Sequence, residues 1–213
     1  MPISLKEQNP DCIFGLWTIT ETHEELLRAF KSVPDEEVER LVKFKNPNRQ
    51  IERIVTRLLI YELLGKQVII DYDENGKPLL RDDKRQISIS HTSGMVAVVI
   101  GNKFAGVDVE KISGRVAKIA HKFLSPTELD SIDISNQMLH MYAFWSAKET
   151  IYKIYGRKKL DFKDNIKIEA FDIKDKGTIK ANLQMDESEL FELDYFIYRV
   201  DEENKYMIVK CCG

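Results

Sequence analysis

The chain has 213 residues, of which 43% are hydrophobic and 31% are charged. This is enough apolar material for a buried core in one domain or in two small lobes. The 32 Lys and Arg and the 35 Asp and Glu leave a net charge of −3, which excludes wholesale binding of nucleic acid through a basic surface. No apolar run reaches the length of a membrane span, because the longest, 95–100, has the length of a strand.

The three cysteines, Cys12, Cys211 and Cys212, do not have the spacing of a disulfide framework or of a zinc site. The first residues lack the basic and then apolar pattern of a secretion signal. We therefore expect a soluble protein of a reducing compartment, most simply the cytoplasm.

The first half of the chain predicts one strand, three helices and then a series of strands. The third helix has apolar residues at helical spacing between Ile51 and Leu63 and stops at Gly65. Acidic residues after Pro34 favour the start of the second helix there. The expected elements are a strand over 11–20, helices over 23–30, from 35 and after 46–48, and strands over 68–72, 87–90 and 95–100.

The second half predicts a strand, two helices and further strands. Ser125, Pro126 and Glu128 form a capping box with proline at the first helical position. The expected elements are a strand over 105–110, helices from 126 and over 137–155, and strands over 166–171, 195–200 and 206–209. No internal repeat is apparent. The mixed elements and hairpin-length spacings predict an α+β fold rather than a doubly wound parallel sheet.

Two carboxylates, Asp108 and Glu110, lie on one predicted strand. Residues two apart on a strand share a face, so both point the same way while Val107 and Val109 point into the core. Neighbouring carboxylates repel unless a cation joins them, and Mg²⁺ prefers such oxygen ligands. The alternative is an acidic, solvated edge strand.

The predicted helix 137–155 carries a third carboxylate. Glu149 shares a helix face with Trp145 and Lys153, each about one turn away. One interpretation is a surface ion pair between Glu149 and Lys153, with Trp145 in the core. The other places Glu149 beside the acidic pair of the strand, with Lys148 and Lys153 neutralising an anionic substrate.

Three shorter features could contact phosphate. The segment 90–94 (Ser-His-Thr-Ser-Gly) offers hydroxyl and amide donors, although an ordinary hairpin turn explains it as well. Neighbouring side chains on a strand face opposite ways and no nucleophile elbow is present, so a Ser–His hydrolase is discounted. Arg49, Arg53 and Arg57 line one helix face, which alone favours a solvated face. The segment 75–79 is explained as a turn.

The order and spacing of these features are more specific than any one of them. Four blocks follow one another: Gly-Lys-Pro at 76–78, Ser-x-Ser-His at 88–91, Gly-x-Asp-x-Glu at 106–110 and Trp-Ser-x-Lys-Glu-x-x-x-Lys at 145–153. In this series the sequence resembles the 4′-phosphopantetheinyl transferases, specifically the longer two-lobed class that activates peptide and polyketide synthases. Asn75 stands where the family commonly has an aromatic residue, and Thr92 replaces a common serine.

The resemblance implies an enzyme that moves the phosphopantetheine arm of coenzyme A onto a serine of an apo acyl or peptidyl carrier protein, releasing adenosine 3′,5′-bisphosphate. It implies two similar small α+β lobes in one chain, a pseudo-dimer in which each lobe has a mainly antiparallel sheet and packed helices. We expect the lobes at 1–103 and 104–213, with the active site in the cleft between them, and a monomer. No nucleic-acid or membrane partner is expected.

The resemblance also assigns roles to particular residues. Asp108, Glu110 and Glu149 would hold Mg²⁺, with Mn²⁺ as an alternative ion, against the pyrophosphate of coenzyme A. Glu149, or a water held by the metal, would take the proton of the carrier serine. Lys148 and Lys153 would lie near the phosphates and steady the leaving oxygen. The residues implied to bind coenzyme A are Arg53, Lys77, Pro78, Ser90 and His91, with Arg49, Lys43 and Lys45 as weaker candidates.

Two other functions stay open at this point. A coenzyme A or carrier-protein binding module of the same fold would have lost catalysis, but the chain has all three carboxylates and both lysines. Another Mg²⁺-dependent nucleotide enzyme could use the acidic strand, but no Gly-x-x-x-x-Gly-Lys-[Ser/Thr] loop occurs, which disfavours a nucleoside triphosphatase. For docking of a carrier protein, the candidates are Phe123-Leu124 and the helix from Pro126.

Overall fold

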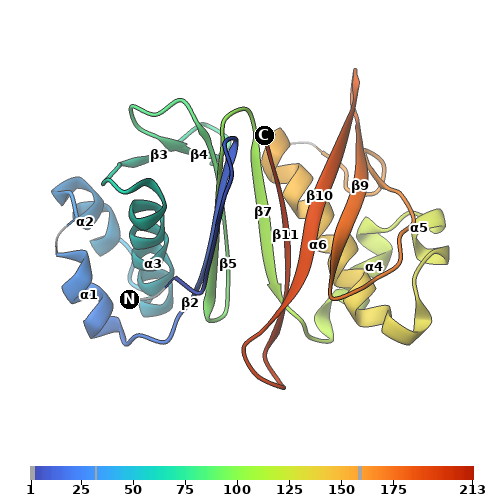
Figure 1. The fold of residues 1–213 in the computed structure, drawn as a ribbon, viewed down its shortest axis with the longest axis horizontal. Helices are drawn as coiled ribbons and strands as arrows, with labels where there is room; N and C mark the ends of the chain where they lie inside the picture. Colours follow the sequence, from blue (N-terminus) through green and yellow to red (C-terminus); the bar gives the residue numbers. More distant parts are fainter. Residues whose placement is uncertain (1–2, 32, 158–159) are drawn as a thin grey trace. The chain divides into compact units, whose positions relative to one another are not determined.

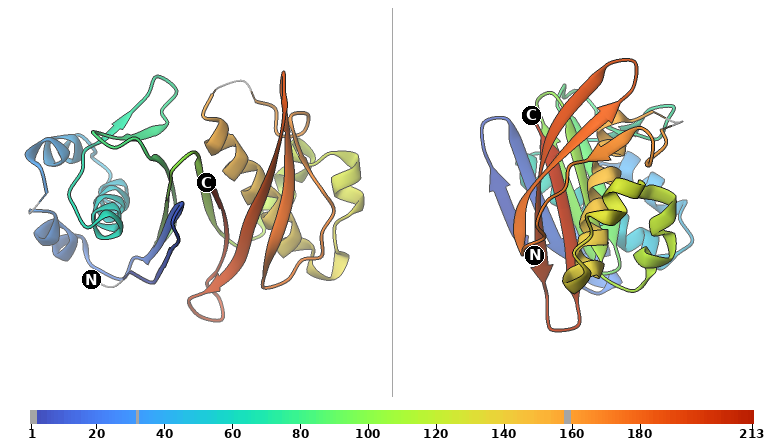
Figure 2. Two further views of the ribbon diagram at one scale, coloured as in Figure 1. Left: turned by 45° about the horizontal axis from the view of Figure 1, so that its top comes forward. Right: turned by 90° about the vertical axis from the view of Figure 1, so that its right-hand side faces the viewer.

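The computed structural model of the protein describes residues 3–31, 33–157 and 160–213. The chain divides into two compact units: unit 1 comprises Met1–Phe104 and Cys212–Gly213, and unit 2 comprises Ala105–Cys211. Each unit has one sheet with helices, which is the α+β fold that the sequence predicts. Within each unit the helices lie on one face of the sheet (Figure 1, Figure 2).

Unit 1 has a six-stranded antiparallel sheet with the order β1-β2-β6-β5-β4-β3. Its strands are β1 (Leu5–Gln8), β2 (Cys12–Thr18), β3 (Ile70–Tyr72), β4 (Pro78–Leu80), β5 (Gln86–Thr92) and β6 (Met95–Gly101). Its helices are α1 (His23–Phe30), α2 (Asp35–Val42) and α3 (Pro47–Leu64). The core of unit 1 lies between helices and sheet, where Trp17, Leu59 and Val98 are at most 1% exposed.

Local sequence signals set the ends of these helices. The capping box of α1 joins Thr22 and Glu25. α3 begins where the side chain of Asn46 accepts from the backbone N–H of Asn48, with proline in the first turn, and it ends at Gly65, whose φ of 66° favours glycine. The predicted stop at Gly65 is therefore confirmed, whereas the helix begins at Pro47, within the segment 46–48 that was expected to precede it.

Unit 2 has a five-stranded sheet with the order β7-β11-β10-β9-β8. Its strands are β7 (Ala105–Lys111), β8 (Ile166–Ile168), β9 (Lys176–Gln184), β10 (Ser188–Arg199) and β11 (Lys205–Cys212). Its helices are α4 (Arg115–Phe123), α5 (Pro126–Asp130), a 3₁₀ turn η1 (Ile134–Asn136) and α6 (Gln137–Tyr155). The predicted capping box starts α5, and Gly156 ends α6 with a φ of 67°.

Several elements differ from the sequence expectations. The strands β1, β4 and β9 and the helix α4 were not expected. Charged residues interrupt the apolar patterns of β1, β9 and α4, and β4 begins at Pro78 in the segment 75–79 that was explained as a turn. The strand expected over 166–171 ends at Ile168, and the one expected over 195–200 is the second half of the longer β10. β1 is an edge strand, where pattern carries little information, whereas β9 lies between β8 and β10 and buries Ile179, Ala181 and Leu183.

The two units repeat one topology, which confirms the two similar α+β lobes implied by the resemblance, although no repeat was apparent in the sequence itself. Each unit runs strand, three helices and four strands, and apart from the edge strand β1 the strand orders correspond one to one. A shift of 91 residues relates Gly15 on β2 to Gly106 on β7, and Gly65 after α3 to Gly156 after α6. Most side chains paired by this shift differ, so the repeat is visible in the fold more than in sequence identity.

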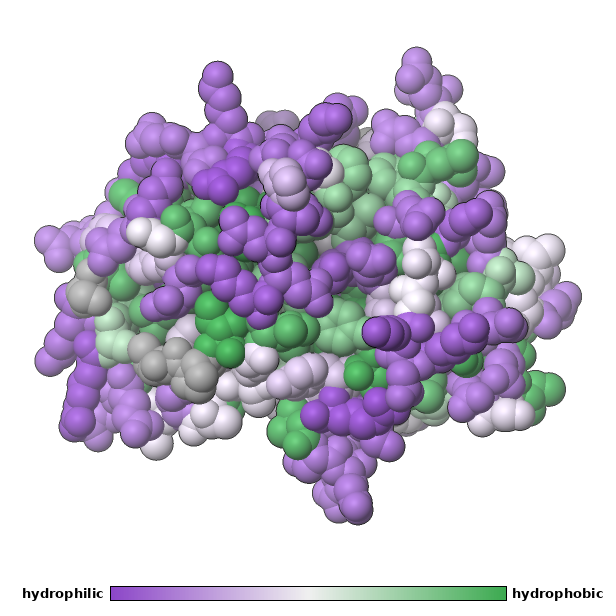
Figure 3. All heavy atoms as spheres, viewed as in Figure 1, coloured by the Kyte–Doolittle hydropathy of each residue, from purple (hydrophilic) through white to green (hydrophobic). Residues whose placement is uncertain are grey.

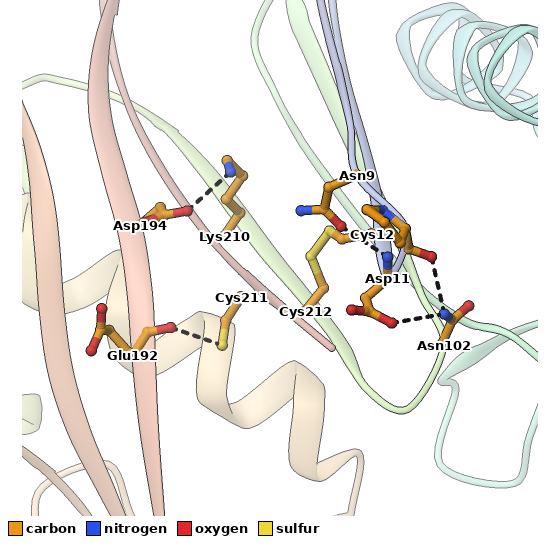
Figure 4. The surroundings of a disulfide bond; sticks show 10 residues. Asn9, Asp11, Cys12, Asn102, Glu192, Asp194, Lys210, Cys211 and Cys212 are labelled. Carbon is orange, nitrogen blue, oxygen red and sulfur yellow. Dashed lines mark hydrogen bonds and ion pairs between the residues drawn. A yellow bond between two sulfur atoms is a disulfide. The ribbon is translucent and has the colours of Figure 1, made fainter.

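The cysteines also differ from expectation, because Cys12 and Cys212 form a disulfide (Figure 4). Their Cα atoms are 5.9 Å apart although 200 residues separate them in the sequence. In the same unit the backbone N–H of Phe104 donates to the carbonyl oxygen of Gly213 at 3.0 Å, which holds the chain end there. Cys211, in unit 2, is buried and has a free thiol. A pairing over such a distance depends on topology and is not visible in cysteine spacing.

The surface is largely polar. The face drawn in Figure 3 is covered mostly by hydrophilic side chains, with smaller hydrophobic areas between them. Among the described residues, no helix is both long enough and apolar enough to cross a membrane.

Candidate functional site

Unit 1 contains a pocket of about 440 Å³ between α3 and the strands β3 and β5. Its lining residues are Phe44, Arg49, Glu52, Arg53, Thr56, Arg57, Tyr72, Gly76, Pro78, Ile89 and His91. A second pocket of about 560 Å³ shares part of this lining. Its lining residues are Arg40, Lys43, Phe44, Arg53, Arg57, Asp71 and Tyr72. We call the two together the basic pocket, because most of their charged groups are cationic.

Aromatic rings orient the cations of the basic pocket. The guanidinium carbon of Arg53 lies 3.9 Å from the centre of the Phe44 ring and 6.0 Å from the centre of the Tyr72 ring. Arg49 donates to Glu52 at 2.9 Å, and Nδ1 of His91 lies 3.4 Å from the same carboxylate. Guanidinium groups beside aromatic faces suit a ligand that carries both phosphate and an aromatic base.

Three of the residues predicted to bind coenzyme A, Arg53, Pro78 and His91, line the basic pocket. Two others, Lys77 and Ser90, do not. Alternation along β5 puts Ile89 and His91 on the pocket side and therefore turns Ser90 to the other face of the sheet. Burial lowers the pKa of Lys77.

Among the weaker candidates, Arg49 and Lys43 line the basic pocket, whereas Lys45 is exposed outside it. The rings of Phe44 and Tyr72 were missed by the sequence reasoning. Tyr72 is 45% exposed, and an exposed aromatic residue beside a basic helix was the available signal.

Unit 2 brings β7 and α6 unusually close together. A Cβ atom at Gly106 would lie 2.6 Å from the carbonyl oxygen of Thr150 and 2.6 Å from a side-chain carbon of Ile154. Only glycine permits this approach. Alternate residues of a strand share a face, so Asp108 and Glu110 face α6 together with Gly106.

Four charged side chains gather at this contact, and we call them the acidic cluster: Asp108, Glu110, Glu149 and Lys153. Nζ of Lys153 donates to Asp108 at 2.8 Å and to the carbonyl oxygen of Val107 at 2.9 Å. The indole N–H of α6 residue Trp145 donates to Glu110 at 3.1 Å.

The acidic cluster is partly removed from water, and this changes how its carboxylates titrate. Burial, assisted by the negative charge of Asp108, raises the pKa of Glu149 to about 7. The same two causes raise the pKa of Glu110, with burial again the larger. A carboxylate with a pKa near neutrality can exchange a proton under ordinary conditions.

No metal site is formed as the side chains stand: within the described residues, no three His, Cys, Asp or Glu side chains are arranged to hold an ion. The ammonium of Lys153 lies against Asp108 instead. The donor set nevertheless fits Mg²⁺ in its chemistry, because burial and then the charges of Asp108 and Glu110 raise the pKa of Glu149, and a cation would relieve this repulsion. Binding of Mg²⁺ here stays a prediction.

Lys148 lies apart from the acidic cluster. Its Nζ donates three hydrogen bonds of 2.8 Å, to Glu128 and to the carbonyl oxygens of Phe162 and Ile166, and the side chain is 0% exposed. An ammonium group has three protons, so all of them are used inside unit 2. The geometry therefore favours a structural role over the predicted contact with phosphate. Its partner Glu128 was expected only as part of a helix cap.

Comparison with known proteins supports the resemblance to the 4′-phosphopantetheinyl transferases. Residues 105–206, nearly all of unit 2, match the model of the 4′-phosphopantetheinyl transferase superfamily. This match confirms the resemblance indicated by the four sequence blocks.

Two similar proteins carry the corresponding name. The chain is 23% identical to 4′-phosphopantetheinyl transferase of Bacillus subtilis, over 87% of this chain and 84% of that protein. It is 27% identical to 4′-phosphopantetheinyl transferase gsp of Aneurinibacillus migulanus, over 59% of this chain and 57% of that protein. The first similarity extends through both units.

Proposed function

We propose that this chain transfers the 4′-phosphopantetheine group of coenzyme A to a serine of an apo carrier protein. The observation that carries the proposal is the acidic cluster of β7 and α6, which lies inside the segment that matches the superfamily model. The basic pocket of unit 1 adds a binding place for a phosphorylated nucleotide. Because one chain holds both parts, we propose that the working form is a monomer.

In the proposed reaction, the serine oxygen of the carrier protein attacks the β-phosphorus of coenzyme A. A new oxygen–phosphorus bond forms, and the bond to adenosine 3′,5′-bisphosphate breaks, so that this group leaves with the electron pair. Glu149 accepts the serine proton as the general base. Asp108, Glu110 and Glu149 would hold Mg²⁺, which when bound neutralises charge on the pyrophosphate.

Coenzyme A is proposed to place its phosphates against Arg53 and His91 and its adenine beside Pro78 and Tyr72. Arg53→Ala is expected to raise the dissociation constant of coenzyme A about tenfold, because the pocket loses a cation that the Phe44 ring orients. Arg49→Ala is the matched control with a smaller effect, since Arg49 is 57% exposed and already paired with Glu52. Calorimetric titration with coenzyme A measures both, and equal effects of the two variants would contradict the assigned pocket.

The docking surface for the carrier protein needs a correction. Phe123 and Leu124 are 1% and 0% exposed, so they are core residues and cannot contact a partner. The helix α4 instead exposes Arg115, Lys118 and Lys122, which lie on one face at helical spacing. We propose that this basic face of α4 binds the acidic helix usual in carrier proteins.

We also propose that the protein works in the cytoplasm, where the Cys12–Cys212 pair would be reduced.

The test of the proposed function is the intact mass of an apo acyl carrier protein after incubation with this protein, coenzyme A and Mg²⁺. We expect a gain of one phosphopantetheine group, and no gain with EDTA. Glu149→Gln should lose the reaction, whereas Asp130→Asn, an exposed acid on α5, should retain it. No gain with several acyl and peptidyl carrier proteins, while coenzyme A still binds, would replace the transferase by a catalytically silent binding module.

A further inference from the structure

A buried glutamate in unit 1 ties two helices and a strand together. Oε2 of Glu37, on α2, accepts from Nε of Arg57 on α3 at 2.8 Å, and Oε1 accepts from the backbone N–H of Ile70 on β3 at 2.9 Å. The Glu37 side chain is 0% exposed and that of Arg57 is 3% exposed. Such a pair is costly to break, because the remaining charge would be buried without a partner.

Unit 2 has the same arrangement at the equivalent place. Oε2 of Glu128, on α5, accepts from Nζ of Lys148 on α6 at 2.8 Å, and Oε1 accepts from the backbone N–H of Ile168 on β8 at 3.0 Å. Glu128 is 3% exposed. We call the two arrangements the unit 1 clamp and the unit 2 clamp.

The acid and the cation of the two clamps correspond in sequence position, whereas the amide donors, Ile70 and Ile168, are 98 residues apart. The shift of 91 residues that relates Gly15 to Gly106 also relates Glu37 to Glu128 and Arg57 to Lys148. In both units the acid comes from the second helix, the cation from the third helix, and the amide from the strand that follows. Since most surrounding side chains differ between the units, the clamp is a feature of the repeated scaffold.

Each clamp lies directly beside candidate site residues. In unit 1, Arg57 is one helical turn from Arg53, and Tyr72 follows two residues after Ile70 on β3; all three side chains, Arg53, Arg57 and Tyr72, line the basic pocket.

In unit 2, Lys148 is the residue before Glu149 on α6. Nζ of Lys148 donates to the carbonyl oxygen of Phe162. The ring of Phe162 packs on Trp145, with ring centres 5.7 Å apart. Trp145 in turn donates to Glu110.

We infer that Glu37 and Glu128 are equivalent positioning residues, one for the basic pocket of unit 1 and one for the acidic cluster of unit 2. The inference rests on the proposed function for its kinetic meaning. Neither glutamate needs to touch a substrate, because each acts through the helix that its clamp holds. The cation of each clamp is then a structural partner, which explains why Lys148 has no proton to offer to a phosphate.

A first test needs no activity. The chain has two tryptophans, Trp17 in unit 1 and Trp145 in unit 2, so their indole N–H signals in a nitrogen–proton NMR spectrum of the whole protein report the two units separately. Glu128→Gln is expected to shift the Trp145 signal and leave the Trp17 signal in place, and Glu37→Gln the reverse. Glu39→Gln and Asp130→Asn, which are exposed and also 91 residues apart, are the controls. A Trp145 signal unmoved by Glu128→Gln would overturn the inference for unit 2.

The kinetic test separates the two clamps. Glu128→Gln is expected to lower kcat about tenfold or more and to leave the dissociation constant of coenzyme A within about twofold. Glu37→Gln is expected to raise that dissociation constant and KM about fivefold or more, with kcat within about twofold. Equal effects of both variants on the same constant, or a loss of unfolding temperature alone, would mean that the clamps are merely structural.

Two further experiments apply if a variant does not fold or if the unaltered protein is inactive. If Glu128→Gln does not fold, Glu128→Gln with Lys148→Met removes both charges, should fold, and should still shift the Trp145 signal and lower kcat. If the unaltered protein transfers no phosphopantetheine, the proposed function fails, and the indole signals and the binding of coenzyme A still decide the positioning roles.

Discussion

Unit 1 and unit 2 place different side chains at equivalent positions of one scaffold. Two residues after Gly15 on β2, unit 1 has Trp17, and two residues after Gly106 on β7, unit 2 has Asp108. On the third helix, Leu58 of unit 1 corresponds to Glu149 of unit 2. Trp17 and Leu58 belong to an apolar core and are 1% and 9% exposed. At the same contact of strand and helix, unit 2 therefore has a charged cluster where unit 1 has hydrophobic packing.

The polar chemistry of unit 1 lies elsewhere on the same scaffold. Its basic pocket uses the α3 residues Arg49, Arg53 and Arg57 together with β3 and β5. The features that both units share are the glycine contact, the buried clamp and the glycine after the third helix. These shared features determine the fold, whereas a few exchanged side chains determine which charges each unit presents.

The largest expected effect is on stability at the apolar position of this comparison. Trp17→Ala should lower the free energy of unfolding by about 4 kcal/mol, because it removes a large buried side chain and leaves a cavity in the core. Urea unfolding followed by circular dichroism measures the change. A loss below about 1 kcal/mol would show that the position is not part of the packed core.

At the equivalent position in unit 2 we expect lost activity rather than lost stability. Asp108→Asn should lower kcat for carrier modification about a hundredfold, while relief of repulsion with Glu110 and Glu149 offsets the lost ion pair with Lys153. The rate is followed by intact mass of the carrier protein, and stability by urea unfolding. Full activity in this variant would remove Asp108 from the proposed site.

Gly15 on β2 and Gly106 on β7 should also respond differently to substitution by alanine. At Gly106 the added carbon meets the backbone oxygen of Thr150, which cannot move without displacing α6, so we expect a loss of about 3 kcal/mol in unfolding free energy together with lower activity. At Gly15 it meets side-chain carbons of Leu59 and Leu63 at 2.8–2.9 Å, which can adjust, so about 1 kcal/mol is expected. Thermal and urea unfolding of both variants tests this order, and the reverse order would contradict it.

The sequence predicted those parts of the molecule that local rules control. The long helices, their glycine stops and the α5 capping box follow from spacing and from local hydrogen bonds. The four blocks led to the three carboxylates and to His91.

The rest depended on tertiary contacts. Nothing in the spacing of Lys148 distinguished a buried partner of Glu128 from a phosphate ligand. The orientation of Ser90, which faces away from the pocket, could be predicted only with knowledge of the register of β5 in the sheet. The 91-residue shift was present in the sequence, but few of the residues that it pairs are identical, and it becomes evident only when the two sheets are compared.

The smallest expected effect concerns a surface network that unit 1 adds to the shared scaffold. Asp71, next to Ile70 of the unit 1 clamp, accepts from Arg81 and Arg40, which lower its pKa to about 2. A lowered pKa contributes stability above the unfolded value of about 3.9, and this stability is lost as pH falls through about 2.

Because the Asp71 side chain is 35% exposed, the contribution should stay below about 1 kcal/mol. Asp71→Asn should therefore lower the unfolding temperature slightly at pH 6 and match the unaltered protein near pH 2, whereas Glu169→Gln, its exposed counterpart beside Ile168, should have no such pH dependence. Thermal unfolding across this pH range measures both. If the two variants behave alike, the network contributes nothing measurable to the stability of unit 1.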